Sequence, residues 1–519
     1  MSIRYRFRRL RGPINAGPPN LFKSQNLIQK DWSELLGSGG TTGLGQTPAT
    51  FTTGSTSCSD FVVFNTGLAG SPTQPNIIAF YNVYASCNSG VPTVYWAYNT
   101  GGTVLTSVTL SLDGSQIAFI QSSSGNVASL VLLKWKASTG TLASPATPTA
   151  ATNALYNTCT TPCSTSITFS GSNNDTRSSP FVAYGTSKLY VGDDAGLLHQ
   201  FTNIFSTAAA PAEVTTGGWP ANVNSSAALA NPVYDSASTR VFVGDYIVSS
   251  TSPCQPSSTT TNSPCGYLYA VNSSGTVTRS AQLDYNNGIL DAPIVDSTTG
   301  EVFVFAGDDG STNCTSSTPC AAVYQFPVGF ASAAAGPKAT VGTGYEFLLS
   351  GTLDNAYFTS PTGTGHLYVI GNTGPANNTL YQVSINSGIM SSGAATAGPV
   401  LSTNYTNSLY AAGLQVTEFN AGANDYIFLS VLAYGGVSGC GTASLTNGCV
   451  IGYNVTSGTI SSSTTPTGAT AEAGGTSGIV VDNGSAGAQN IYFSTLLNQT
   501  CTTSGGTGGC AIQTIQSAP

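Results

Sequence analysis

The sequence contains very few charged residues. Asp, Glu, Lys and Arg make up 7% of its 519 residues, whereas an average soluble domain carries about 25%. A coiled coil or a large helical bundle needs Glu, Lys, Leu and Ala at helical spacing, so both are excluded. The chain also lacks any apolar run near the roughly 18 residues that span a bilayer. We therefore expect no transmembrane segment.

Histidine is also rare, since the chain has only two. Both His199 and His366 lie inside predicted strands, where a packed, hydrogen-bonded role is more common than catalysis. The sequence has no G-x-S-x-G elbow, no G-x-x-x-x-G-K-[ST] phosphate loop and no G-x-G-x-x-G turn followed by a helix. These absences argue against a Ser-His-Asp or Cys-His enzyme. They leave enzymes that work with carboxylates open.

The few charges are unevenly placed along the chain. Residues 1–30 contain seven basic residues and no acidic one, whereas the rest carries a net charge of −15. An acidic body argues against a nucleic acid partner, because phosphate binding needs clustered Lys and Arg. The basic start is similar to the first part of an export signal, but the apolar part of a complete signal peptide is not seen. We interpret residues 1–46 as a basic, largely irregular segment and residues 47–519 as the folded domain.

Cysteines are present in an even number, twelve, and ten of them are separated from a neighbouring cysteine by 3 to 10 intervening residues. No CxxC pair occurs, so the pattern indicates disulfides rather than structural zinc. Because disulfides persist in oxidising compartments, we expect a secreted, periplasmic or cell-surface protein. Sequence neighbours should pair: Cys58 with Cys87, Cys159 with Cys163, Cys254 with Cys265, Cys314 with Cys320, Cys440 with Cys449, and Cys501 with Cys510.

Short runs of β-branched and aromatic residues recur along the chain and indicate buried strands. The clearest run begins at positions 76, 116, 188, 240, 301, 366, 425 and 490, with one run before it and another after it. We name these strands A, B and C, followed by a weaker D. Radial stacking of such copies buries both faces of each sheet. The sequence therefore predicts an all-β fold, a single β-propeller of eight four-stranded blades, with seven blades as the alternative.

Three stretches carry a family resemblance. Residues 189–201, Leu-Tyr-Val-Gly-Asp-Asp-x-Gly-x-Leu-x-x-Phe, resemble the repeat of PQQ-like, quinoprotein-type β-propellers, and so do residues 241–272. Residues 111–119 are similar to the repeat of TolB-type propellers. The resemblance implies the fold only, because such repeats specify a fold more than a function. The quinoprotein cofactor site has adjacent cysteines, and this chain has no Cys-Cys pair, so we expect no such cofactor.

The eighth copy lacks an outer strand before the chain ends at Pro519. An open edge strand favours aggregation, and closing the ring removes it. The alternating segment Thr47–Thr53 lies just before the first copy. We predict that this N-terminal strand closes the propeller, with residues 49–53 pairing with residues 511–515.

Acidic residues follow the B strands of three successive copies. In a propeller, the B–C loops and the connections into the A strands lie on one face, so these acids should share one sector. They suggest a Ca²⁺ or cationic-ligand site, or an acid/base pair for glycoside chemistry. Alternatively, they only form the turns, because Asp caps nearby backbone N–H groups. The five candidates are Asp193, Asp194, Asp245, Asp308 and Asp309.

These observations favour a non-enzymatic scaffold that binds a protein or glycan through its disulfide-stapled B–C loops. Rigid loops on a rigid scaffold commonly form recognition surfaces. We expect Cys58–Cys87 on this face, Cys159–Cys163 on the opposite face, and a ligand that is neutral, cationic or bridged by Ca²⁺. One alternative is a propeller-fold glycoside hydrolase or lyase that uses Asp carboxylates. A second is a subunit of an extracellular filament, connected through the basic N-terminal segment or an unpaired strand edge.

Overall fold

The computed structural model describes residues 28–52, 56–123, 127–171, 175–247, 254, 265–311, 314, 319–344, 347–373, 377–403, 414–482 and 490–516. The chain divides into two compact units. Among described residues, unit 1 contains 194–198 and 216–471, and unit 2 contains 28–193, 199–215 and 472–516. The described helices are short: η1 (Asn88–Gly90), α2 (Asn153–Tyr156) and α3 (Asn355–Thr359). Within this described part, no helix has the length and apolarity to cross a membrane.

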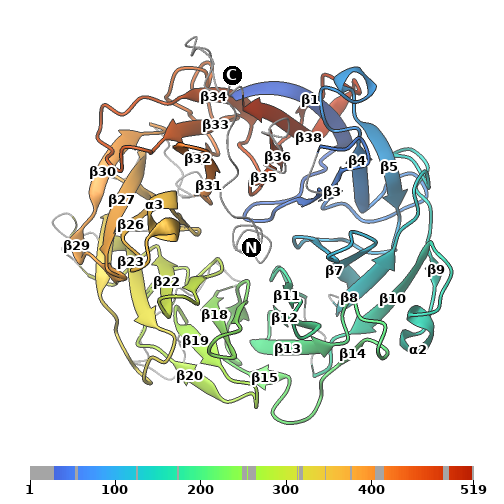
Figure 1. Ribbon diagram of the computed structural model, residues 1–519, viewed down its shortest axis with the longest axis horizontal. Coiled ribbons are helices and arrows are strands. Elements are labelled where there is room, and N and C mark those ends of the chain that lie inside the picture. Colours follow the sequence, from blue (N-terminus) through green and yellow to red (C-terminus); the bar gives the residue numbers. More distant parts are fainter. Residues whose placement is uncertain are drawn as a thin grey trace. The chain divides into compact units, whose positions relative to one another are not determined.

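Unit 2 contains antiparallel sheets whose strands follow chain order (Figure 1). The first sheet consists of β2 (Ala49–Phe51), β3 (Phe61–Asn65), β4 (Ile77–Tyr81) and β5 (Thr93–Tyr98). The second consists of β6 (Thr109–Leu110), β7 (Gln116–Ser123), β8 (Val127–Lys134) and β10 (Cys163–Thr168), with β9 (Thr149–Ala150) beside β10. The third consists of β11 (Phe181–Ala183), β12 (Lys188–Gly192), β13 (Leu197–Thr202) and β14 (Ala212–Glu213), the first two residues of β13 falling in unit 1.

The last sheet of unit 2 joins strands from both ends of the sequence. It runs in the order β35 (Val480–Asp482), β36 (Asn490–Ser494), β38 (Thr507–Gln516) and β1 (Ile28–Gly37), and β37 (Gln499–Thr500) pairs with β38. In Figure 1 the blue strand β1 lies beside the red strand β38. A strand from the N-terminal part of the chain therefore supplies the outer strand of this sheet.

Unit 1 repeats the same antiparallel order. One sheet consists of β16 (Ala228–Leu229), β17 (Val233–Asp235), β18 (Arg240–Tyr246), β19 (Leu268–Val271) and β20 (Val277–Arg279). Another consists of β31 (Thr417–Ala421), β32 (Asn424–Val431), β33 (Asn447–Asn454) and β34 (Gly468–Ala473), the last two residues of β34 falling in unit 2. The short strand β15 (Ala221–Asn222) pairs with residues 197 and 198 of β13.

A ten-stranded sheet completes unit 1 and consists of two antiparallel groups. The groups meet through parallel pairing of β24 (Lys338–Thr343) with two strands of the second group, at Gly342 with Asn372 and at Ala339 with Gly393. The first group is β21 (Ile294–Asp296), β22 (Glu301–Ala306), β23 (Cys320–Pro327) and β24 (Lys338–Thr343). The second is β25 (Thr352–Leu353), β26 (Gly365–Asn372), β27 (Asn378–Asn386), β28 (Ile389–Met390), β29 (Gly393–Ala394) and β30 (Thr396–Val400), of which β29 pairs back with β24.

The central strands are mostly apolar because both of their faces are buried. Every residue of β3 is buried, and in β22 only Glu301 is partly exposed. In unit 1, one core cluster joins Phe303 of β22 to Val369 of β26. Another, in unit 2, joins Val63 of β3 to Phe119 of β7. Repeated antiparallel sheets that bury both faces, with an N-terminal strand completing the last sheet, form the topology of a β-propeller. The all-β propeller prediction is confirmed, and the number of blades stays a prediction.

Seven of the eight predicted B strands occupy the second position of an antiparallel group, as expected. The exception is the first copy, where the run that begins at residue 76 is β4, the third strand of its sheet. The true B strand is β3, Phe61–Asn65. The error arose because both runs are short, apolar and bounded by turn residues, so neither could be ranked by sequence pattern.

The predicted closing segment is wrong in its residues, although closure by an N-terminal strand is correct. Residues 49–51 form β2 and pair with β3 instead. The pairing with β38 is made by β1, whose residues Ser33 and Glu34 lie opposite Ile512 and Ala511. Irregularities between Lys30 and Trp32 and between Leu35 and Gly37 break its alternation. Part of the segment expected to be irregular is therefore a strand, while its residues 1–27 lie outside the described part of the chain.

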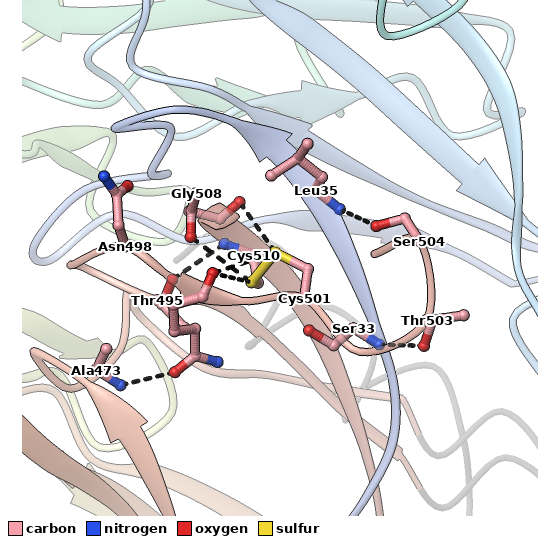
Figure 2. Close-up of a disulfide and its surroundings, with 12 residues drawn as sticks. Ser33, Leu35, Ala473, Thr495, Asn498, Cys501, Thr503, Ser504, Gly508 and Cys510 are labelled. Atoms are coloured by element: carbon pink, nitrogen blue, oxygen red, sulfur yellow. Dashed lines mark hydrogen bonds between the residues drawn. A yellow bond between two sulfur atoms is a disulfide. The ribbon is translucent and has the colours of Figure 1, made fainter. Parts of the chain in front are cut away.

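The free edge of β1 is covered by the hairpin that Cys501–Cys510 closes (Figure 2). The backbone N–H of Ser33 donates to Thr503 Oγ1 (2.8 Å), and that of Leu35 donates to Ser504 Oγ (2.9 Å). The N–H of Thr503 donates back to the carbonyl of Ser33 (3.0 Å). An uncovered edge would be a template for pairing with another chain. The disulfide hairpin therefore protects the closing strand at these residues.

Candidate functional site

All six predicted disulfides are present. The predicted face of one of them is wrong. Cys58 precedes β3 and Cys87 follows β4, so this bridge lies where strands A–B and C–D connect, and not at the B–C end. The error follows directly from the misplaced first B strand. Cys159–Cys163 lies at the C–D end, as predicted, because Cys163 begins β10.

The other four disulfides lie at the B–C ends of their sheets. The loop between β32 and β33 is a fully described example. A Cβ on Gly435 would lie 2.9 Å from Cys440 Cβ and 3.0 Å from Cys449 Cβ, so the backbone passes directly over the disulfide. The side-chain amide of Asn447 donates to the carbonyls of Cys440 (2.9 Å) and Thr442 (2.7 Å). The disulfide and this amide hold the exposed loop in one conformation.

Asp245 is the second-last residue of the B strand β18 and is fully buried, unlike a surface ligand. Its Oδ1 accepts from the backbone N–H of Tyr267 (2.7 Å). Its Oδ2 accepts from the Tyr269 hydroxyl (2.9 Å) and the Asn224 amide (2.5 Å). Burial raises the pKa of Asp245 to about 6, and these hydrogen bonds oppose the rise. The carboxyl therefore ties strand β18 to the start of β19 at the B–C end.

A neighbouring acid, Asp284, was missed in the sequence. It lies in the connection from β20 to β21 and is completely buried. Its Oδ1 accepts from the N–H groups of Asn286 and Gly288 (2.9 Å each), and its Oδ2 accepts from those of Gly307 (2.6 Å) and Asp308 (3.0 Å). Burial raises its pKa to about 7. Asp284 thus fastens the connection into strand A against the end of β22, which confirms that these two segments share one face. The local sequence does not reveal this role of Asp284, because half of its donors lie in the distant segment that follows β22.

Asp308 and Asp309 follow β22 and have opposite electrostatic environments. Burial and the charge of Asp309 raise the pKa of Asp308, whose Oδ1 accepts from the N–H of Gly310 (2.9 Å). Burial raises the pKa of Asp309, but hydrogen bonds from the ammonium of Lys338 and from several N–H groups lower it by more. The net shift of the Asp309 pKa is therefore downward. Its Oδ1 accepts from the N–H groups of Ser311 (3.0 Å) and Cys320 (2.9 Å). Both acids hold the turn together.

Asp193 belongs to unit 2 and forms a buried cluster with His199 and Glu213. When the imidazole is protonated, its Nδ1–H donates to Glu213 Oε1 (2.6 Å) and its Nε2–H donates to Asp193 Oδ2 (3.2 Å). Phe169 packs on the ring at a centroid distance of 4.4 Å. Burial lowers the pKa of His199, but the two carboxylates raise it more, so the net shift is upward. The adjacent Asp194 is partly exposed and falls in unit 1.

The expected structural role of the histidines is confirmed. His199 is buried between the two carboxylates just described. His366, in β26, contacts Asp354 Oδ2 through Nδ1 (2.8 Å), and its backbone N–H donates to Asp354 Oδ1 (3.1 Å). Asp354 in turn caps α3 by accepting from the N–H of Tyr357 (2.8 Å). Each histidine therefore joins two segments of the fold.

Four of the five predicted acids are buried, Asp194 is partly exposed, and nowhere in the described ranges do three or more His, Cys, Asp or Glu side chains form a group that could hold a metal ion. In unit 1, Asp245, Asp284 and Asp309 each accept backbone N–H groups at the base of a B–C loop. An exposed positive charge lies near Asp245. It is the guanidinium of Arg279, which lies 4.5 Å above the ring of Tyr267, the residue whose N–H donates to Asp245. The arrangement can hold loops in fixed conformations.

No family model matches the chain, and no curated protein matches it. Solved structures of similar fold include BamB from Moraxella catarrhalis (10% identity, TM-score 0.41, covering 94% of this chain and 97% of that one). The Dos1 propeller is similar at 8% identity and a TM-score of 0.48, covering 95% and 97%. Prolyl oligopeptidase B from Galerina marginata is similar at 8% identity and a TM-score of 0.40, covering 90% of this chain and 55% of that one. At these scores no function is transferred to this chain.

Proposed function

We propose that this protein is a secreted or surface-exposed binding scaffold that recognises a protein or glycan through its disulfide-stapled B–C loops. The observation that carries the proposal is how these loops are anchored. Four of them contain a disulfide, and buried carboxylates bond the backbone at the base of two of them. Holding a loop in one conformation lowers the entropy cost of binding. Stability of the sheets alone does not require such anchoring.

The disulfide-bonded protein can be tested on a printed array of defined glycans and purified extracellular protein domains. We expect binding to at least one class of probe. The double variant Cys440→Ser/Cys449→Ser releases the fully described loop and should weaken that binding about tenfold. Cys159→Ser/Cys163→Ser is the matched control, because it removes a disulfide from the C–D end and should bind normally. No bound probe, or equal loss in both variants, contradicts the proposal.

We also propose that the acidic residues bind Ca²⁺, which could bridge the protein to its ligand. The candidate ligands for Ca²⁺ remain Asp193, Asp194, Asp245, Asp308 and Asp309, of which only Asp194 is partly exposed to solvent. Titration with CaCl₂ in a calorimeter tests this point on the intact protein. Heat of binding that disappears in Asp194→Asn or Asp308→Asn would support a calcium-bridged ligand. An unchanged titration in both variants would leave the acids with the anchoring role alone.

A hydrolytic function on glycans is the second candidate, and one observation favours it. Asp308 and Asp309 are neighbours whose pKa values are moved in opposite directions, which is the arrangement that separates a general acid from a general base. Incubation of the bound glycans with the protein should then yield shorter products, and Asp308→Asn should abolish them. Intact glycans after prolonged incubation would contradict hydrolysis and leave the binding proposal untouched.

A further inference from the structure

Unit 2 contains a continuous group of aromatic rings that the proposed function does not use. The rings of Phe51, Phe61, Tyr81, Tyr95 and Trp135 form what we call the aromatic shelf. Phe61 lies at centroid distances of 5.4 Å from Phe51, 5.5 Å from Tyr95 and 5.2 Å from Trp135. Tyr81 and Tyr95 are stacked at 4.7 Å, and Tyr95 lies 5.0 Å from Trp135. All five belong to one compact unit.

The shelf lies at the end of its sheets opposite the B–C loops. Phe51 is the last residue of strand A, Phe61 is the first of strand B, and Tyr81 is the last of strand C. Trp135 directly follows β8, the C strand of the next sheet. These positions are the A–B and C–D ends. The shelf is therefore separate from the loops to which the proposed function is assigned.

The shelf is the outer edge of a core and is partly open to solvent. Phe61 is 3% exposed and forms its base, whereas Phe51, Tyr81, Tyr95 and Trp135 are each partly exposed. In most cores such large rings are covered by neighbouring side chains. Partly exposed, contiguous aromatic surface on a soluble domain commonly marks a binding site.

The rings are held in place by the backbone. The indole Nε1–H of Trp135 donates to the carbonyl of Gly114 (2.7 Å). Gly114 has φ +72°, and a Cβ there would lie 2.6 Å from the ring of Phe51. Only glycine therefore allows this turn to approach the shelf. Because the rings are already fixed, a ligand that stacks on them loses little conformational entropy from the protein.

The chemistry of the shelf fits a neutral, ring-shaped and hydroxylated ligand. A sugar ring presents an apolar C–H face that can lie on an aromatic ring, and hydroxyl groups at its edge. Burial and the neighbouring Tyr81 raise the pKa of Tyr95, so its hydroxyl stays neutral and can donate. The amide of Asn82 and the hydroxyl of Thr93, at the ends of β4 and β5, add polar groups beside Tyr81.

Charge at the shelf does not favour an ionic ligand. The ammonium of Lys134 is directed away, to the carbonyls of Tyr156 (2.8 Å) and Asn157 (2.9 Å). Asp60, directly before Phe61, is buried and accepts a hydrogen bond from the Tyr84 hydroxyl (3.0 Å). The exposed charged residues close in sequence are one base, Lys136 after Trp135, and one acid, Asp113 before Gly114. A balanced edge around neutral rings suits an uncharged partner.

We propose that the aromatic shelf binds a neutral oligosaccharide whose sugar rings pack against the partly exposed rings of Tyr81, Tyr95 and Trp135. This site is independent of the B–C loops, so a glycan could be held here whatever the loops bind. The inference rests on the geometry of the five rings and on the partial exposure of four of them.

The test uses the full-length, disulfide-bonded protein and calorimetric titration with defined hexasaccharides. The neutral probes are cellohexaose, maltohexaose, mannohexaose and N-acetylchitohexaose, and the acidic probe is hexagalacturonate. We expect at least one neutral probe to bind. Tyr81→Ala and Tyr95→Ala should each weaken it about tenfold, a loss of about 1.4 kcal/mol. Tyr95→Phe, which keeps the ring, should retain most of the affinity and shows that the fold tolerates the position.

Three controls distinguish stacking on these rings from binding through charge or through the B–C loops. Lys136→Gln should leave the affinity unchanged, and so should Cys440→Ser/Cys449→Ser, which alters a B–C loop. Tryptophan fluorescence should change on binding, and this change should be lost in Trp135→Phe. The proposal is overturned if no neutral probe binds, if the alanine variants bind as well as the parent, or if only the acidic probe binds and Lys136→Gln removes it. It is also overturned if light scattering shows a dimer that Tyr95→Ala dissociates, because the shelf is then an interface between copies.

Discussion

The two units of the molecule connect their inner strands in different ways. In unit 1 a single buried carboxylate, Asp291, accepts hydrogen bonds from residues that precede other inner strands. Its donors are the Asn231 amide (3.0 Å), the Gln415 amide (2.7 Å), and the N–H (3.0 Å) and hydroxyl (2.7 Å) of Ser350. These residues precede β17, β31 and β25, and Asp291 itself precedes β21. One side chain thus links four strand groups.

Unit 2 makes the same kind of connection with a series of single bonds. The N–H of Gly478 donates to the carbonyl of Gln46 (2.6 Å), ahead of β35 and β2. The N–H of Thr47 donates to Ser107 Oγ (2.9 Å), and the N–H of Ser107 donates to Ser179 Oγ (2.9 Å). Ser107 and Ser179 precede β6 and β11. Each connection between neighbouring inner strands in unit 2 therefore depends on a different residue.

The difference between the units arises because a carboxylate can accept more hydrogen bonds than a hydroxyl group. A carboxylate has about four lone-pair sites, whereas a hydroxyl oxygen has two and normally serves fewer donors. Unit 1 therefore concentrates its inner connections in one charged residue, and unit 2 distributes them over neutral groups. A unit that depends on one acceptor should be far more sensitive to a single substitution than a unit with distributed bonds.

The largest expected effect is that of Asp291→Ala. The substitution leaves several buried donors without an acceptor, and each unsatisfied donor costs about 1–3 kcal/mol. We expect a loss of about 3–5 kcal/mol in the free energy of unfolding, measured by urea titration with tryptophan fluorescence. Asp113→Ala, at an exposed turn, is the matched control. A loss below about 1 kcal/mol, the net worth of one ordinary hydrogen bond, would show that Asp291 does not hold the inner strands of unit 1.

Removing the disulfide that covers the closing strand should have the next largest effect. Cys501→Ser/Cys510→Ser opens a loop of sequence separation 9, and the chain-entropy model assigns about 2–3 kcal/mol to such a loop. The change should also release β1, since Thr503 and Ser504 lie in this hairpin. Hydrogen exchange should therefore accelerate at Ser33 and Leu35. Unchanged protection there would show that pairing with β38 alone secures the strand.

The buried histidine of unit 2 should make stability depend on pH. The pKa of His199 is raised when folded, so its stabilising contribution is complete below its ordinary pKa near 6.5 and is lost as the pH rises through the folded value. His199→Gln should cost on the order of 1.5–3 kcal/mol at pH 6 and less at pH 9. His366→Gln provides the comparison with a partly exposed ring. A cost that grows from pH 6 to pH 9 would contradict the assignment of a charged His199.

The smallest effect is expected when one of the single hydrogen bonds between inner strands of unit 2 is removed. Ser107→Ala removes the acceptor for the N–H of Thr47 and should cost about 1 kcal/mol in the same urea titration. Ser115→Ala, on an exposed turn, serves as the control. If Ser107→Ala destabilises as strongly as Asp291→Ala, the contrast between concentrated and distributed connections is not real.

Several candidate-site residues could be recognised in the sequence, but their roles could not. Asp245 and Asp309 were singled out because they follow B strands, and they were expected to face a ligand. In the structure both are buried and bind the backbone at the base of loops. Asp284 and Asp291 accept more hydrogen bonds and were not singled out, because many of their donors come from segments distant in the sequence. Whether any of the acids also binds Ca²⁺ stays a prediction.

The sequence alone determined the features that depend on nearby residues. Apolar runs between turn residues defined the strands, and closely spaced cysteines defined the six disulfides. The tertiary structure decided which segment closes the last sheet and on which face Cys58–Cys87 lies. It also brought Phe51 to Trp135 across two sheets, within the group of rings around Phe61. These features depend on pairing between distant strands, and many short β-runs of similar composition are equally able to form such pairs until the packing of the whole sheet selects one of them.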